Sequence, residues 1–146
     1  MQSQPSERAA VVATIDPANY NNSTQNSDYV DMSKFHEAMF VVLLGAVDST
    51  VDFKLRESRD TSATGEQDIS GKAITQFTAS DDNKQAVINL KSEELTAQPS
   101  QYRYVRARLT VGNGTTNIVS VIAFGMRPRI GPASDDKLSD TAQIVT

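Results

Sequence analysis

Residues 101–111 read QYRYVRARLTV, and from Tyr104 onward polar and apolar side chains alternate along the stretch. Alternation with a period of two is typical of a β-strand that buries one face. One face of this strand would carry Arg103, Val105, Ala107, Leu109 and Val111. The other face would carry Tyr102, Tyr104, Arg106, Arg108 and Thr110. We expect the first face to lie in a hydrophobic core and the second on an outer surface.

The sequence around this strand predicts hairpins. Gly112-Asn113-Gly114-Thr115 follows it, and Asn-Gly between apolar runs is a strong hairpin signal, so residues 117–124 should pair with it. Residues 50–57 alternate in the same way. The segment 35–47 is ambiguous, since Ser33 could cap a helix there and Gly45 could end it. Its β-branched and aromatic content favours a strand, joined to residues 50–57 through a tight turn.

Further strands complete the predicted fold. We expect them at residues 9–15, 28–31, 72–79 and 85–90, with polar loops at 19–27 and 58–67 and a turn at 80–84. Asp16-Pro17 should stop the first of them. About eight strands with short connections predict an all-β fold. The expected architecture is an antiparallel β-sandwich that resembles a jelly roll.

The two ends of the chain differ from the middle. Residues 1–8 are polar, and after Gly125 the apolar pattern stops. Pro128 and Pro132 lack the N–H group that a central strand needs. The sequence therefore predicts an N-terminal arm at residues 1–8, a sandwich at 9–125 and an extended C-terminal arm at 126–146.

The composition of the 146 residues excludes several classes of function. There is no cysteine, which excludes disulfides, thiol nucleophiles and thiolate metal sites. The net charge of −4 argues against broad binding to nucleic acid. No secretory signal pattern opens the chain, and the longest uncharged apolar run, residues 38–47, is too short for a membrane helix. We expect a soluble protein made in a cytoplasm, with no nucleic-acid or membrane partner.

Few residues suggest catalysis or metal binding. His36 is the only histidine, and no nucleophile motif accompanies it, so it is interpreted as a structural residue at a strand start. Asp81-Asp82-Asn83 lacks the spacing and the glycine of a calcium loop and fits a solvated turn. The sequence predicts no enzyme activity, no cofactor and no metal.

The outer face of the strand at 101–111 combines arginine and tyrosine. Three interpretations remain open: a solvated face with Arg–carboxylate pairs, which is favoured, a protein interface, or a surface that stacks on nucleic acid or sugar. The candidate protein-interface residues are Tyr102, Tyr104, Arg106, Arg108, Arg127 and Arg129.

Five blocks of sequence carry a resemblance to a known family. They are residues 30–40 (VDMSKFHEAMF), 45–48 (GAVD), 51–58 (VDFKLRES), 68–74 (DISGKAI) and 102–107 (YRYVRA). In this order they resemble the small structural proteins of tailed bacteriophages that are encoded beside the major capsid protein, including capsid cement or decoration proteins. The similarity covers about residues 28–125. It carries no binding residues that can be transferred.

The resemblance implies a function. A protein of this family would sit on the outer surface of the assembled capsid and join neighbouring subunits. Its partners would be the major capsid protein and further copies of itself, as a dimer or trimer. Alternatives are a neck or tail component of the virion and, from another class, a carbohydrate-binding jelly-roll module. The absence of tryptophan weighs against the carbohydrate module.

Overall fold

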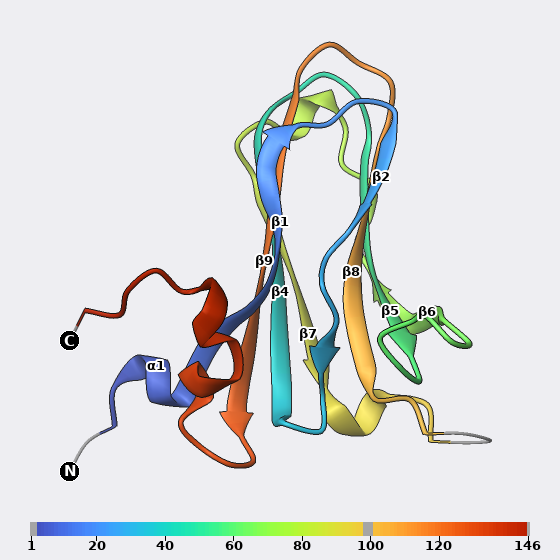
Figure 1. The fold of residues 1–146 in the computed structure, drawn as a ribbon. Helices are drawn as coiled ribbons and strands as arrows, with labels where there is room; N and C mark the ends of the chain where they lie inside the picture. The colour runs from blue at the N-terminus through green and yellow to red at the C-terminus, as the bar shows by residue number, and fades with distance from the viewer. Residues whose placement is uncertain (1–2, 98–100, 146) are drawn as a thin grey trace.

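Two antiparallel β-sheets pack face to face in the computed structural model, which describes residues 3–97 and 101–145 (Figure 1). The four-stranded sheet has the order β1-β9-β4-β7, with β1 at Ala9–Asn19, β9 at Asn117–Pro128, β4 at Phe35–Val47 and β7 at Gln85–Lys91. The five-stranded sheet has the order β2-β8-β5-β6, with β2 at Ser23–Asn26, β8 at Tyr104–Val111, β5 at Val51–Ser58 and β6 at Gln67–Ala73. The short β3 at Val30–Asp31 pairs with β8.

Most connections cross from one sheet to the other. The chain changes sheet between β1 and β2, β3 and β4, β4 and β5, β6 and β7, β7 and β8, and β8 and β9. This order is that of an eight-stranded jelly roll with β3 as an addition. The predicted antiparallel β-sandwich of jelly-roll type is therefore confirmed. The segment 35–47 is a strand, as its composition favoured.

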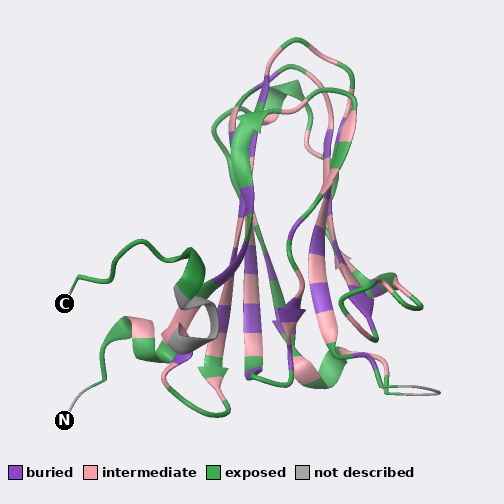
Figure 2. Ribbon diagram, in the orientation of Figure 1, coloured by how far each residue is buried: buried purple, intermediate pink, exposed green. Residues whose placement is uncertain are grey.

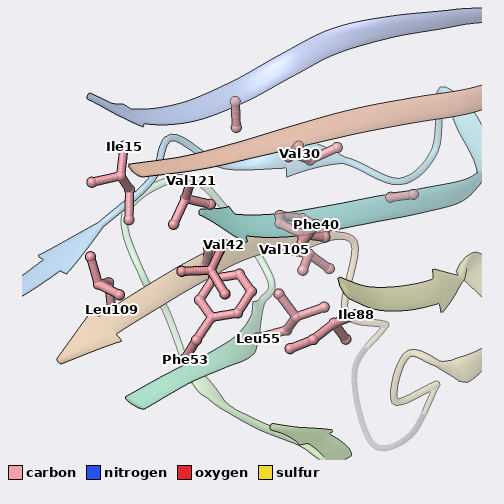
Figure 3. Close-up of a cluster of buried hydrophobic side chains, with 14 of the residues drawn as sticks. Ile15, Val30, Phe40, Val42, Phe53, Leu55, Ile88, Val105, Leu109 and Val121 are labelled. Carbon is pink, nitrogen blue, oxygen red and sulfur yellow. The ribbon is translucent and has the colours of Figure 1, made fainter. Parts of the chain in front are cut away.

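The core lies between the two sheets, where burial alternates along the long strands β4, β5, β8 and β9 over most of their length (Figure 2). From β8 it receives Val105, Ala107, Leu109 and Val111, the face that the alternation at 104–111 predicted. Phe40 and Val42 of β4 pack opposite Phe53 and Leu55 of β5 (Figure 3). Each such buried side chain contributes about 1.5–3 kcal/mol of transfer free energy. The hydrophobic core therefore holds the sheets together.

Both predicted hairpins are wrong. β4 pairs with β9 and β7, whereas β5 pairs with β8 and β6. The links after β4 and after β8 instead span the gap between the sheets, about 10 Å in a β-sandwich, and arch side by side at the top of Figure 1. The two strands that each link joins must bury their apolar faces against each other across the core. This requirement overrides the local turn signal.

Buried Asn117 ties the two links together. Its Oδ1 atom accepts hydrogen bonds from the backbone N–H of Asp48 (3.2 Å), the backbone N–H of Ser49 (3.1 Å) and the Ser49 hydroxyl (2.9 Å). The Asp48 carboxylate accepts from the N–H of Thr115 at 2.8 Å. A Cβ on Gly114 would lie 2.0 Å from the Asp48 carboxylate, so a larger residue here would displace that carboxylate.

Several predicted strand limits are also corrected. β1 continues through Asp16-Pro17 to Asn19 with a register shift between Ile15 and Ala18. It is an edge strand, where a bulge accommodates a proline without loss of a central ladder bond. The predicted loop at 19–27 contains β2. The predicted strand at 28–31 is confirmed in part by β3.

The region of the predicted strand at 72–79 is arranged differently. β6 begins at Gln67 and ends at Ala73, and beyond it Phe77 forms an isolated bridge with Val51. The predicted turn at 80–84 overlaps a 3₁₀ turn, η1, at Ala79–Asp81. The predicted strand at 85–90 is confirmed as β7. A second 3₁₀ turn, η2, follows it at Ser92–Glu94.

The ends of the chain pack against the sandwich. α1, Pro5–Arg8, and η3, a 3₁₀ helix at Ala133–Asp140, lie beside β1 and contact each other (Figure 1). β9 continues to Pro128, which pairs with Phe35 at the strand end, where its missing N–H disrupts no central bond. Ala133 is fully buried. The expectation of an extended arm from residue 126 is thus wrong over residues 126–140. No helix among the described residues is long and apolar enough to cross a membrane.

Candidate functional site

The outer face of the five-stranded sheet carries a group of arginines. Arg106 and Arg108 project outward from β8, and cross-strand pairing places Arg56 of β5 opposite Arg106 and Lys54 opposite Arg108. Like charges on directly opposed positions destabilise a sheet. This arrangement therefore requires a nearby carboxylate. We call Lys54, Arg56, Arg106 and Arg108 the arginine cluster.

Glu66, which directly precedes β6, supplies that carboxylate. Its oxygens lie 2.5 Å from Arg106 Nε, 3.2 Å from Arg56 Nε and 3.1 Å from an Nη atom of Arg108. The two Nε atoms are at ion-pair distance without hydrogen-bond geometry. Asp68 adds contacts of 3.2 Å to Arg56 and 2.8 Å to Lys54. Four cationic side chains thus share two carboxylates.

The protonation of Glu66 reflects these neighbours. Burial by itself would raise the pKa of the carboxyl group, because the charged form loses water. The contacts with Arg106 and Tyr29 and the charge of Arg56 outweigh burial and hold the pKa below its ordinary value. Glu66 is therefore ionised at neutral pH.

Two tyrosines fix the positions of the arginines. The Tyr29 hydroxyl donates to Glu66 at 2.7 Å, and the Arg106 guanidinium lies 4.7 Å from the centre of the Tyr29 ring. Tyr29 and Tyr104 meet edge to face at 6.4 Å. Arg103 stacks on Tyr104 at 5.1 Å and makes two hydrogen bonds, of 2.7 and 2.6 Å, to Asp31. Contacts within the chain itself therefore position these side chains.

The six predicted interface residues occupy three places. Tyr104, Arg106 and Arg108 share the outer face of the five-stranded sheet. Tyr102 was expected on the same exposed face but is buried, because its hydroxyl donates to the Gly65 carbonyl and Arg59 covers its ring.

Arg127 and Arg129 lie at the end of β9 in the other sheet. Arg127 pairs with Glu37 at 3.0 Å, and Arg129 donates to the Ser92 hydroxyl at 3.0 Å. The structure therefore does not bring these two residues to the arginine cluster.

His36 lines an open hollow of about 770 Å³ at the end of the sandwich where β4 begins. Arg59, Arg103, Arg129 and Glu93 also line it. His36 stands at the second residue of β4, as expected for a histidine at a strand start.

The Asp81-Asp82 pair lies at η1, where Asp82 accepts from the Val47 N–H at 2.7 Å and Asp81 pairs with Lys84 at 2.8 Å. Over residues 3–97 and 101–145, no group of three or more histidine or acidic side chains gathers as a metal site would.

Sequence reasoning missed Glu66, Arg56 and Tyr29 as members of this surface. Glu66 lies in the segment 58–67, which was interpreted as a polar loop. A signal was present, because the alternation at 50–57 places Lys54 and Arg56 on an outer face. Only the pairing of β5 with β8 shows that these charges add to those of Arg106 and Arg108.

Comparison with protein-family models gives no match, and comparison with curated proteins gives none either. Among solved structures, the chain is similar to one from the cryo-EM structure of Broad Bean Stain Virus, with 12% identity, a TM-score of 0.49, and coverage of 89% of this chain and 94% of that chain. A chain of infectious bursal disease virus Gt strain has 8% identity and a TM-score of 0.43, and the match covers 86% of this chain and 33% of that one.

The CBM22-1 xylan-binding domain of Paenibacillus barcinonensis Xyn10C has 12% identity and a TM-score of 0.36, with 82% of this chain and 81% of that domain covered. The class that the structure itself defines is a jelly-roll β-sandwich.

Proposed function

We propose that this chain is a structural virion protein that binds the outside of an assembled phage capsid and bridges neighbouring capsid subunits. The resemblance of residues 28–125 to small tailed-phage structural proteins supports this proposal. Some of the proteins it resembles look like capsid cement or decoration proteins with a jelly-roll fold, and this chain adopts a jelly roll. The observation that carries the proposal is the ordered arginine and tyrosine surface on the five-stranded sheet.

This surface has the properties of a protein interface. Arginine and tyrosine are the residues that most often dominate binding energy, since each buries a large area with directional contacts. Arg106 and Tyr104 are half-buried and already fixed by Glu66 and Tyr29, so little side-chain entropy is lost on binding. A preorganised surface of this kind suits a rigid partner such as a shell.

The charge of the surface indicates the chemistry of its partner. The four cations of the arginine cluster exceed the two carboxylates that contact them, although the chain as a whole has a net charge of −4. A local excess of positive charge favours an acidic patch on the partner. We therefore propose that acidic residues of the capsid subunit face this cluster.

Co-sedimentation with capsids that lack the protein tests the proposal. The full-length chain should sediment with assembled capsids and bind free capsid subunits weakly, because a bridging site is complete only after assembly. The variant pair Lys54→Ala/Arg108→Ala should weaken capsid binding at least about tenfold. Arg56 and Arg106 remain in this variant to neutralise Glu66.

The matched control is Lys84→Ala/Lys91→Ala, which removes the same charge from positions outside the cluster. This control should bind like the unmodified chain. Failure of the full-length chain to bind capsids, or binding to necks or tails instead, would contradict the proposal. Equal weakening by the two variant pairs would show that overall charge, and not the arginine cluster, drives binding.

The structure also determines where the chain can be shortened. A chain that stops at Gly125 would lose Met126, which pairs with both Ala9 and Glu37. A chain that stops at Asp140 keeps β9 and η3 whole. Comparison of this shortened chain with the full chain in the same assay measures what residues 141–146 add to capsid binding.

A further inference from the structure

The outer face of the four-stranded sheet is apolar where an outer face is usually polar. Residues that alternate with core positions such as Phe40, Val42 and Val121 point away from the core on this side. Leu43 and Val87 are 45% and 48% exposed. We call the following six residues the apolar face: Met39, Val41, Leu43, Val87, Ile122 and Phe124.

Strand register makes this face continuous. Val41 of β4 lies opposite Ile122 of β9 on one side and opposite Val87 of β7 on the other. Met39 lies opposite Phe124, two residues along the same strands. Apolar side chains therefore touch across the strands rather than standing singly, and a contiguous exposed apolar patch is typical of an interaction surface.

The face is uncharged over its central rows. Neutral residues occupy the positions paired with it: Thr14 pairs with Ile122, Asn89 with Met39, and Gln85 and Ser120 with Leu43. Charged side chains lie at its margins: Asp16 in the bulge of β1 near Ser120, and Glu37 opposite Lys91 one row beyond Met39. The partner of this face therefore needs no compensating charge.

The described ends of the chain leave the β7 side of this face open. η3 packs against β1, at the far edge of the sheet from β7, and also contacts β9. Thr141–Val145 are exposed. Leu43 and Val87 accordingly keep nearly half of their surface in contact with solvent.

We propose that two copies of this chain associate face to face through the apolar face. An uncharged face can meet its own copy about a two-fold axis without opposing like charges. The arginine cluster on the other sheet cannot do so, because its excess positive charge would face itself. Self-association thus buries the apolar face and leaves both arginine clusters on the outside, facing away from each other.

The outer face of the four-stranded sheet is large enough for a specific dimer. With strands about 4.8 Å apart and outward positions repeating about every 6.8 Å, it measures roughly 20 by 27 Å over four rows, and the apolar face lies within three of these rows on β4, β9 and β7. Two such faces bury on the order of 1,000 Å² together, which is near the lower limit of specific interfaces. A reversible dimer with a micromolar dissociation constant is the expected result.

Analytical ultracentrifugation of the purified chain over a range of concentrations tests the proposal independently of capsids. The unmodified chain should shift from monomer to dimer as its concentration rises. The double substitution Leu43→Glu/Val87→Glu places charge in the centre of the face and should raise the dissociation constant at least about 100-fold. Both positions are exposed in the monomer, so the variant should fold, and far-UV circular dichroism checks this.

Ile130→Glu provides the matched control, because Ile130 is 86% exposed and lies beyond the end of β9. It should dimerise like the unmodified chain. A monomer at all concentrations would overturn the proposal, even if capsid binding is found. A dimer that persists in the folded Leu43→Glu/Val87→Glu variant would also overturn it, because association would then use another surface.

Discussion

Replacing Asn117 by alanine should destabilise the fold by separating the two links that cross between the sheets. Asn117 is fully buried at the first residue of β9. Its side-chain oxygen accepts three hydrogen bonds from Asp48 and Ser49, in the link between β4 and β5. Alanine removes that acceptor and leaves a small cavity.

The size of the loss follows from what each donor can still reach. The Asp48 N–H also donates to the Thr116 carbonyl at 3.0 Å, so it keeps a partner. The Ser49 hydroxyl can rotate toward water, since Ser49 is half-buried. The part-buried Ser49 N–H loses its acceptor, and a donor left unsatisfied costs about 1–3 kcal/mol. With the cavity included, we expect a loss of about 2–3 kcal/mol in the free energy of unfolding.

Urea denaturation followed by circular dichroism at pH 7 measures this loss. Asn113→Ala is the control, because Asn113 is exposed in the link between β8 and β9 and its substitution should change stability by less than about 0.5 kcal/mol. A loss below about 0.5 kcal/mol for Asn117→Ala, or equal losses for the two variants, would refute the reasoning that this side chain joins the links.

Two further predictions concern the five-stranded sheet. Leu109→Ala should cost about 2–5 kcal/mol in urea denaturation, since Leu109 is fully buried between the sheets. Arg108→Ala should cost well under that, because Arg56 and Arg106 still neutralise Glu66; equal losses would contradict the assignment of faces. Glu66→Gln should destabilise the protein at pH 7, because the arginines lower the pKa of Glu66 despite its burial. The ionised carboxylate stabilises the fold above its unfolded pKa of about 4.3. The difference in the free energy of unfolding between Glu66→Gln and the unmodified chain should therefore shrink when denaturation is measured at lower pH. A difference that stays constant down to pH 3 would show that the charge of Glu66 is not its cause.

The sequence predicts individual strands better than it predicts their partners. The alternation at 104–111 correctly indicates which face of β8 is buried, because a strand with one buried face has a period of two. The Asn113-Gly114 turn signal is misleading, since it reports only local backbone preference. The prolines give a similar error: Pro17 and Pro128 occupy strand positions because one lies in a bulged edge strand and the other at a strand end.

The candidate surfaces show the same limit. Sequence reasoning selects Arg106 and Arg108 through their position on the outer face of a strand. It cannot select Glu66, whose role depends on β5 pairing with β8 and on the path of the segment before β6. The run Val41-Val42-Leu43-Leu44 indicates a strand apolar on both sides, but whether the second side is covered is a property of the assembled layers.

The sequence by itself therefore determines the class of the fold and the faces of its strands. These follow from local periodicity and from the free energy of burying apolar side chains, which act within a few residues of each other along the chain. Tertiary structure alone determines which strands pair, where the arginine cluster meets Glu66 and which apolar face stays exposed. These depend on contacts between residues far apart in the chain, since a jelly roll joins consecutive strands across its core instead of side by side.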